Sequence, residues 1–153
     1  MDELLRKISQ QWFLREPAYF ALYCTLRTEP NKQMSCPLRV GKGRLEYNPD
    51  LLQDKTFKEA EQLMRIEMIR LFLKHPYERQ PDGVEPRALA LGSDVTICDY
   101  YNQPGSREVL PLVAPEVFGL ESGQHFEWYA RHIQQLLDDA TTDLTDTDVS
   151  NSI

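Results

Sequence analysis

The side chains that could do chemistry lie in two segments of this chain. The first segment holds Glu67, Arg70 and His75, and the second holds Asp94 and Cys98. Carboxylate, imidazole and thiolate groups are the ligands that zinc takes in proteins, and a catalytic zinc site usually has three of them plus a water molecule. His75 and Asp94 alone are too few. Cys98 follows Asp94 by one helical turn and could point at the same spot, so His75, Asp94 and Cys98 form a candidate set of metal ligands.

The immediate neighbours of Glu67 carry a more specific signal. In a helix of the form H-E-x-x-H, two histidines one turn apart hold a zinc ion, and the glutamate between them acts as general base. Here Ile66 and Arg70 stand at the two histidine positions. Isoleucine cannot bind a metal, and arginine stays cationic at any ordinary pH. Glu67 is therefore interpreted as the relic of a general base. The segment is interpreted as unable to bind zinc and so as lacking metallopeptidase chemistry.

Glu67 and Arg70 each have a plainer interpretation. Helical spacing alone allows an ion pair between them at i,i+3, and we favour this interpretation for Glu67. A guanidinium on a mostly buried helix needs partners. The hypothesis for Arg70 is that it replaces the lost metal as the local cation and holds Glu67 and Asp94. The alternative is that Arg70 extends to the surface beside Lys74.

The remaining candidates also have structural interpretations. A buried structural cysteine is the favoured role for Cys98, because free cysteine is among the most buried residue types. His75, which precedes Pro76, can be a residue at the C-terminal end of a helix whose charge complements the helix dipole. The sequence therefore predicts no metal, and zinc only if the altered set is used.

The N-terminal region is predicted to be helical. An apolar face runs through residues 2–28, and Pro17 divides the region into two helices because proline fits best at a helix start. Turn-forming residues predict a loop over 28–32. Short alternating runs at 37–40 and 44–47 then predict a hairpin, with glycines in the intervening turn that favour positive φ.

The central helix is predicted from about Phe57 to Lys74. Its apolar residues lie nearly all the way round, which is typical of a mostly buried helix. Glu67, Arg70 and Lys74 form its one narrow polar stripe. Pro76 ends it.

The C-terminal half is predicted from weaker patterns. Residues 88–101 favour a second buried helix, although the β-branched run at 95–97 keeps a strand as an alternative. Residues 102–124 are predicted to be ordered but irregular, and 126–137 to be an amphipathic helix. The predicted fold class is α+β, mostly helical with a small antiparallel β-hairpin.

Composition indicates one domain, residues 1–137, followed by a disordered acidic tail, residues 138–153. The formal net charge is −7, and five aspartates in that tail supply −5 of it without any Lys or Arg. The body is therefore near −2 (−7 minus −5) and has no basic stripe. This argues against a nucleic-acid-binding protein, which needs clustered positive charge.

The chain has no apolar run of the roughly 18 residues that span a bilayer, and its start lacks the order of a signal peptide. Its three cysteines are widely spaced, so a disulfide framework is not expected. The expected setting is the cytoplasm, without a membrane partner.

Four segments together resemble the metallopeptidase-like domain of bacterial proteins that often carry a von Willebrand A-like domain after it. They span about residues 15–137 and are, in chain order, Tyr47-Asn48-Pro49 after the hairpin, Ile66-Glu67-x-x-Arg70-x-x-x-x-His75-Pro76, Leu91 to Cys98 with Asp94, and Leu110-Pro111 with Phe118-Gly119-Leu120. The chain departs from the family pattern at two of its three histidine positions, and Cys98 stands where the family often has Asn.

The resemblance implies a zincin-like fold and a degenerate, inactive member that acts by binding a protein. It also implies a setting near AAA-type ATPases or A-domain proteins. The alternative is a metal-dependent hydrolase with an altered site built from Glu67, His75, Asp94 and Cys98. A purely structural subunit is a third class, which would predict a large apolar surface patch and a stable oligomer.

Overall fold

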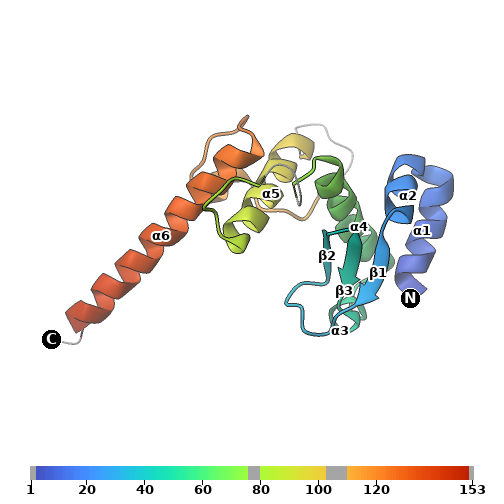
Figure 1. Ribbon diagram of the computed structural model, residues 1–153, viewed down its shortest axis with the longest axis horizontal. Coiled ribbons are helices and arrows are strands. Elements are labelled where there is room, and N and C mark those ends of the chain that lie inside the picture. The colour runs from blue at the N-terminus through green and yellow to red at the C-terminus, as the bar shows by residue number, and fades with distance from the viewer. Residues whose placement is uncertain (1–2, 76–79, 103–109, 152–153) are drawn as a thin grey trace. The chain divides into compact units, whose positions relative to one another are not determined.

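The computed structural model describes residues 3–75, 80–102 and 110–151, with side chains described through residue 141. The chain forms two compact units, Met1–Glu78 and Arg79–Ile153. The predicted α+β class, mostly helical with a small sheet, is confirmed (Figure 1). The predicted domain boundary at residue 137 stays a prediction.

The first unit begins with two helices, as predicted, but the second ends at Cys24 and not at about residue 28. Helix α1 spans Glu3–Arg15 and helix α2 spans Pro17–Cys24. Pro17 occupies the first helical position of α2, where its missing N–H has no intrahelical partner to lose. The break between the helices therefore falls where the proline predicted it.

A three-stranded sheet follows, in the order β1-β3-β2. The predicted hairpin is confirmed: β2 (Leu38–Gly41) pairs antiparallel with β3 (Arg44–Tyr47). Positive φ at Lys42 and Gly43 matches the turn to the twist of the strands. The predicted loop over 28–32 is wrong in its first part, because β1 (Arg27–Pro30) pairs parallel with β3. That pairing joins residues distant in sequence, so local turn propensity could not reveal it.

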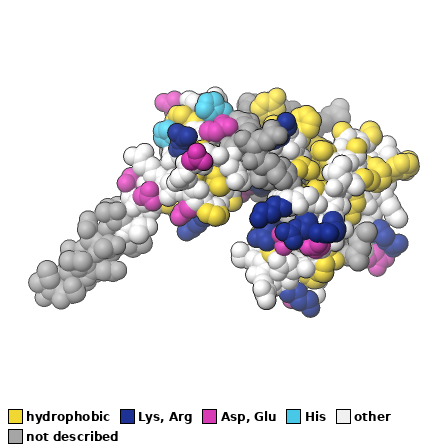
Figure 2. Space-filling view, viewed as in Figure 1, with side chains coloured by type: hydrophobic (Ala, Val, Ile, Leu, Met, Phe, Trp, Pro, Cys, Tyr) yellow, Lys and Arg dark blue, Asp and Glu magenta, His cyan; other side chains and the backbone are white. Residues whose placement is uncertain are grey.

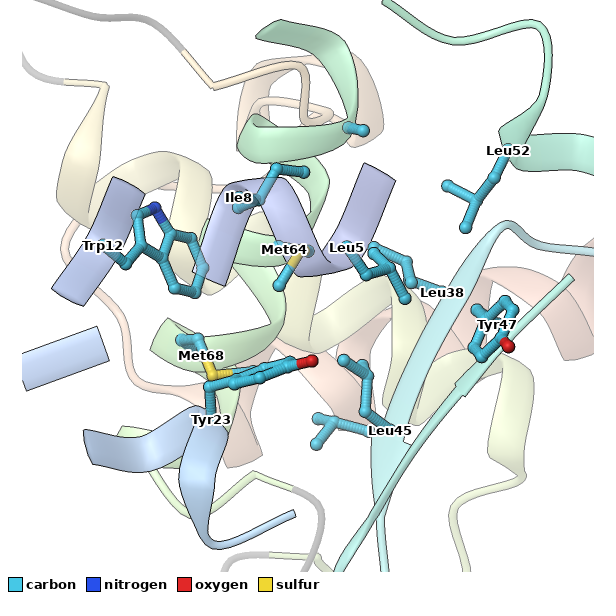
Figure 3. Packing of buried hydrophobic residues seen from close by; sticks show 12 residues of the cluster. Leu5, Ile8, Trp12, Tyr23, Leu38, Leu45, Tyr47, Leu52, Met64 and Met68 are labelled. Atoms are coloured by element: carbon cyan, nitrogen blue, oxygen red, sulfur yellow. The ribbon is translucent and has the colours of Figure 1, made fainter. Parts of the chain in front are cut away.

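One face of this sheet packs on the helices to make the core of the first unit (Figure 3). Alternation along the strands decides which residues face inward, since successive side chains point to opposite sides. The buried residues of this core come from α1, α2, the sheet, α3 (Pro49–Leu52) and α4 (Phe57–Phe72), and they are Leu5, Ile8, Trp12, Tyr23, Leu38, Val40, Leu45, Tyr47, Leu52, Ala60, Met64 and Met68.

Helix α4 has well-defined ends. Thr56 and Glu59 form a reciprocal capping box at its start. At its end, the His75 N–H donates to the Arg70 carbonyl (3.2 Å) and the Lys74 N–H donates to the Leu71 carbonyl (3.0 Å). These two bonds make a Schellman motif, in which Lys74 takes the left-handed conformation with φ 63°. The helix thus stops at Phe72, two residues before the predicted Lys74.

The second unit is built on the packing of α5 (Pro86–Tyr101) against α6 (Phe126–Asn151). The strand alternative for α5 is wrong, since the whole segment is helical. Gly92 allows the close approach: a Cβ built on it would lie 2.8 Å from the Ala130 Cα. Between the helices the described residues, 102 and 110–125, are irregular, as predicted, apart from the 3₁₀ helix η1 (Pro115–Phe118). The rest of the predicted irregular segment lies outside the described residues.

Helix α6 continues through residues 138–151, which the sequence predicted to be a disordered acidic tail. No Gly or Pro interrupts this stretch. Because this stretch lacks the two residues that most disfavour a helix interior, the helix continues through it.

Candidate functional site

The centre of the candidate site is an ion pair within α4. Arg70 Nε lies 3.2 Å from Glu67 Oε2, and Arg70 Nη2 lies 3.4 Å from Glu67 Oε1. The side chains are 15% and 11% exposed, so the pair is largely removed from water. The predicted i,i+3 pair is confirmed. Because Arg70 turns back onto Glu67, extension of Arg70 to the surface is not observed.

Ile66, at the first histidine position, is 3% exposed and belongs to the buried side of α4. Glu67 is itself buried, at 8% exposed, between the buried side chains of Ile66 and Met68 in the sequence of α4. Burying a carboxylate is unfavourable unless it is paired. The Arg70 guanidinium meets that requirement at the position where a zinc-binding helix would have its second histidine.

Cys36, which the sequence did not single out, lies close enough to Glu67 and Arg70 to be influenced by their charges. It lies in the segment before β2 and is half-buried. Burial raises the pKa of the Cys36 thiol, the negative charge of Glu67 raises it further, and the charges of Arg39 and Arg70 oppose that rise. Cys36 is far from Glu67 in sequence, and the packing of β2 against α4 brings the two together. No local pattern could have predicted it.

A second buried pair fixes α4 on the N-terminal helices. Glu61 accepts hydrogen bonds from Trp12 Nε1 of α1 (3.0 Å) and from Arg65 Nε (3.2 Å). Arg65 also pairs with Glu16 at 3.2 Å and lies over the Tyr19 ring, 5.2 Å from its centroid. These contacts connect α1 and α2 to the helix that carries Glu67.

His75 is 2% exposed and lies just beyond α4, at the last position of the Schellman motif. The interpretation of His75 as a residue at the C-terminal end of the helix is therefore wrong, because the helix ends at Phe72 and His75 follows the turn after it. The left-handed Lys74 turns the chain off the helix axis and directs His75 into the interior. The predicted polar stripe likewise ends at Arg70.

Asp94 and Cys98 lie one turn apart on α5, in the second unit. Cys98 is 5% exposed, and burial raises the pKa of its thiol. Asn102 Nδ2 lies 3.3 Å from its sulfur, and the same amide group donates to the Leu110 carbonyl at 3.0 Å. These contacts suit a structural thiol.

Glu67 and Arg70 therefore lie together, with Cys36 within the reach of their charges, while Asp94 and Cys98 belong to the other unit. The joining of Glu67, His75, Asp94 and Cys98 into one metal site stays a prediction. So does the contact between Arg70 and Asp94. Within the described residues, no three His, Cys, Asp or Glu side chains are grouped in a way that could hold a metal ion.

Comparisons with protein families, with characterised proteins and with solved structures give no match to this chain. The resemblance to the metallopeptidase-like domain therefore depends on the four motifs alone. Among the helices that the structure describes, none has the length and apolar character needed to cross a membrane.

Proposed function

We propose that this chain is a metallopeptidase-like domain without catalytic activity that acts by binding a protein partner. The observation that carries the proposal is the contact of Arg70 with both carboxylate oxygens of Glu67. In an active relative that carboxylate would take a proton from a metal-bound water. Here the guanidinium occupies it and supplies a positive charge, but a guanidinium offers only hydrogen-bond donors and no ligand-exchange chemistry.

Support for a binding role comes from the surface of the first unit. Phe13 is 62% exposed and Leu14 is 80% exposed at the end of α1. The Phe13 ring contacts the Phe20 ring of α2 edge to face, with centroids 5.2 Å apart. Figure 2 shows apolar side chains in yellow at the right-hand edge, over these two helices. Large exposed apolar patches are typical of surfaces that contact other molecules, so these side chains support a binding role.

The first test is elemental analysis of the untagged full chain, followed by thermal melting with and without added zinc. A metal that binds the folded state must raise the melting temperature by mass action. We expect no stoichiometric metal and no shift. Stoichiometric metal with a clear rise would overturn the proposal and support the altered-site hydrolase built from Glu67, His75, Asp94 and Cys98.

The resemblance itself can be tested by restoring the motif. In the double variant Ile66→His with Arg70→His, a zincin-like helix regains two ligands one turn apart, and His75 lies just beyond the same helix. We expect zinc to stabilise this variant, and a further His75→Ala change to weaken the effect. The matched control is Lys58→His with Gln62→His, an equally spaced pair on α4 away from His75. Equal stabilisation of both pairs, unaffected by His75→Ala, would show that helical spacing alone is responsible.

The binding role is tested at the apolar patch. Proteins that co-purify with the full chain are compared with those retained by Phe13→Ser combined with Leu14→Ser. The control is Val117→Ser, which changes a side chain that is 71% exposed in the second unit. The proposal expects a partner that the control retains and the patch variant loses. If both variants retain every partner, this patch is not the binding surface.

A further inference from the structure

Helix α2 is apolar throughout, yet most of it lies at the surface of the first unit. None of its eight residues, Pro17–Cys24, is charged. Tyr23 is its one buried residue, three others are half-buried, and four are exposed. A helix that is hydrophobic all round is normally buried. The exposed side of α2 is therefore of the kind that another element covers.

The exposed side of α1 extends this surface and gives it an apolar end and a basic end. The Phe13 ring contacts the Phe20 ring of α2, and Leu14 lies beside Phe13 in the sequence. Helical spacing places Arg6 two turns before Phe13, and Lys7 two turns before Leu14, on the same side of α1. Arg6, Lys7, Phe13 and Leu14 are all exposed. These residues and the exposed side of α2 are called the α1–α2 surface.

The charges of α1 make this surface basic. Helix α1 carries three cations, Arg6, Lys7 and Arg15, against one carboxylate, Glu3, which leaves a net charge of +2. Glu3 lies 3.5 Å from Arg6 and 3.9 Å from Lys7, and all three side chains are more than half exposed. Exposed pairs of this kind are weak, so they hold neither cation firmly. A partner with negative charge is therefore favoured.

The end of α6 has the complementary character. Among the described side chains of this helix, the last buried one is Ile133, whereas the helix continues to Asn151. Its last part extends beyond α5 in Figure 1. Leu136 is 39% exposed, and Ala140, one turn later, is also exposed. Residues 138–151 contain five aspartates and no Lys or Arg. A short helix without a packing partner is only marginally stable in water, so a contact would stabilise it.

The two units have opposite formal charges. Residues 1–78 contain 13 Lys or Arg and 11 Asp or Glu, a net +2, and residues 79–153 contain 4 and 13, a net −9, which together give the −7 of the chain. Two copies of the second unit therefore repel each other, as do two copies of the first. Charge favours contact of the first unit of one copy with the second unit of another.

We propose that the α1–α2 surface binds the end of α6 of a second copy of this chain. Leu136 and Ala140 lie over Phe13 and Leu14, and the aspartates that follow lie over the basic end of the surface, so α6 runs antiparallel to α1. The seven residues from Phe13 back to Arg6 span about 10 Å, as do the seven that follow Leu136. Two equal contacts of this kind close a symmetric dimer. The inference rests on the proposed binding role of this surface and names its partner.

The first experiment is sedimentation equilibrium of the full chain over a wide range of protein concentration, at low and at high salt. We expect the average mass to rise from 17.8 kDa toward twice that value as concentration increases. High salt should weaken the association, because it screens exposed charges. A monomer at every concentration overturns the inference. The binding role would still stand if the co-purification experiment finds a different protein that the patch variant loses.

A pair of variants with equal added charge locates the contact. Ala21→Glu introduces a carboxylate in the exposed middle of α2 and should weaken self-association by about tenfold or more, since like charges brought together repel. The control Gln53→Glu adds the same charge at an exposed position just after α3, away from α2 in Figure 1, and should leave association unchanged. Melting temperatures verify that both fold. If both associate like the wild type, the α1–α2 surface is not the contact.

Charge reversal tests whether the contact joins two copies. One variant combines Arg6→Glu with Lys7→Glu, and the other combines Asp143→Lys with Asp146→Lys. In each variant alone the surface and the end of α6 carry like charges, so each should stay monomeric. In an equal mixture both contacts again join opposite charges, so a dimer containing one copy of each should form. A mixture that stays monomeric, or either variant dimerising alone like the wild type, overturns the inference.

Discussion

Replacing Arg70 with alanine tests whether the guanidinium is what makes a buried Glu67 tolerable. The variant does not weaken the helix itself, since alanine has the highest helix propensity of all residues. It removes both contacts to the Glu67 carboxylate, at 3.2 and 3.4 Å. The carboxylate remains largely buried, with 11% of its side chain exposed. We therefore expect the first unit to lose stability.

The magnitude follows from the burial and the geometry of the pair. Breaking a fully buried pair costs about 3–5 kcal/mol, whereas an exposed i,i+3 or i,i+4 pair contributes about 0.3–0.5 kcal/mol. Contacts at 3.2 and 3.4 Å are longer than usual for charged partners, and Arg70 keeps 15% of its side chain exposed. We therefore expect a loss of about 2 kcal/mol, which corresponds to a fall of about 8–16 °C in the melting temperature of a unit of this size.

The assay must report on the first unit alone, because two compact units need not unfold together. The chain has two tryptophans, Trp12 in the first unit and Trp128 in the second. In a Trp128→Phe background, fluorescence during urea unfolding therefore follows Trp12, which is 1% exposed in the folded core. The loss of unfolding free energy is calculated from the change in the urea midpoint, provided that the dependence of the free energy on urea concentration has the same slope in both proteins.

Two further variants distinguish the buried carboxylate from a general loss of packing. Glu67→Gln in the Arg70→Ala background removes the charge that has lost its Arg70 contacts and should restore part of the lost stability. Arg44→Ala breaks a more exposed pair with Glu29, also at 3.4 Å, and should change stability by about 0.5 kcal/mol or less. If Arg70→Ala unfolds at the wild-type urea concentration, Arg70 is not the compensating cation and the argument for it fails.

Three other changes have definite expected outcomes. Gly92→Ala would place a Cβ 2.8 Å from the Ala130 Cα and should destabilise the second unit by about 1–3 kcal/mol. The control Gly41→Ala has open space around it and should be near neutral. Chemical denaturation gives the free energy of unfolding of both variants. Lys74→Gly relieves a left-handed conformation and should stabilise the first unit by about 1 kcal/mol, and an unchanged or lower melting temperature would contradict this. Because the folded-state pKa of Tyr129 is raised to about 12 from 10.0, the unfolded chain ionises first, so stability is complete below pH 10 and falls as the pH rises toward 12. Tyr129→Phe should make that fall shallower, as measured by urea unfolding across this pH range.

The sequence determined the features that depend on neighbouring residues. Apolar periodicity and Pro17 predicted α1, α2 and the interval between them. The glycines around Lys42 predicted the hairpin, because few other residues accept positive φ. Helical spacing alone was enough to pair Glu67 with Arg70, and the loss of histidine at positions 66 and 70 is a matter of residue identity.

The tertiary structure decided what depends on distant residues. The parallel pairing of β1 with β3 and the approach of Cys36 to Glu67 both join segments that no local pattern relates. The turn at Lys74, which places His75 in the interior, also differed from the local prediction because a lysine there accepts an unfavourable backbone conformation. Local sequence specifies backbone conformation and the side that a residue faces. Only packing specifies which side chains from separate elements meet, and so which chemical environment each of them has.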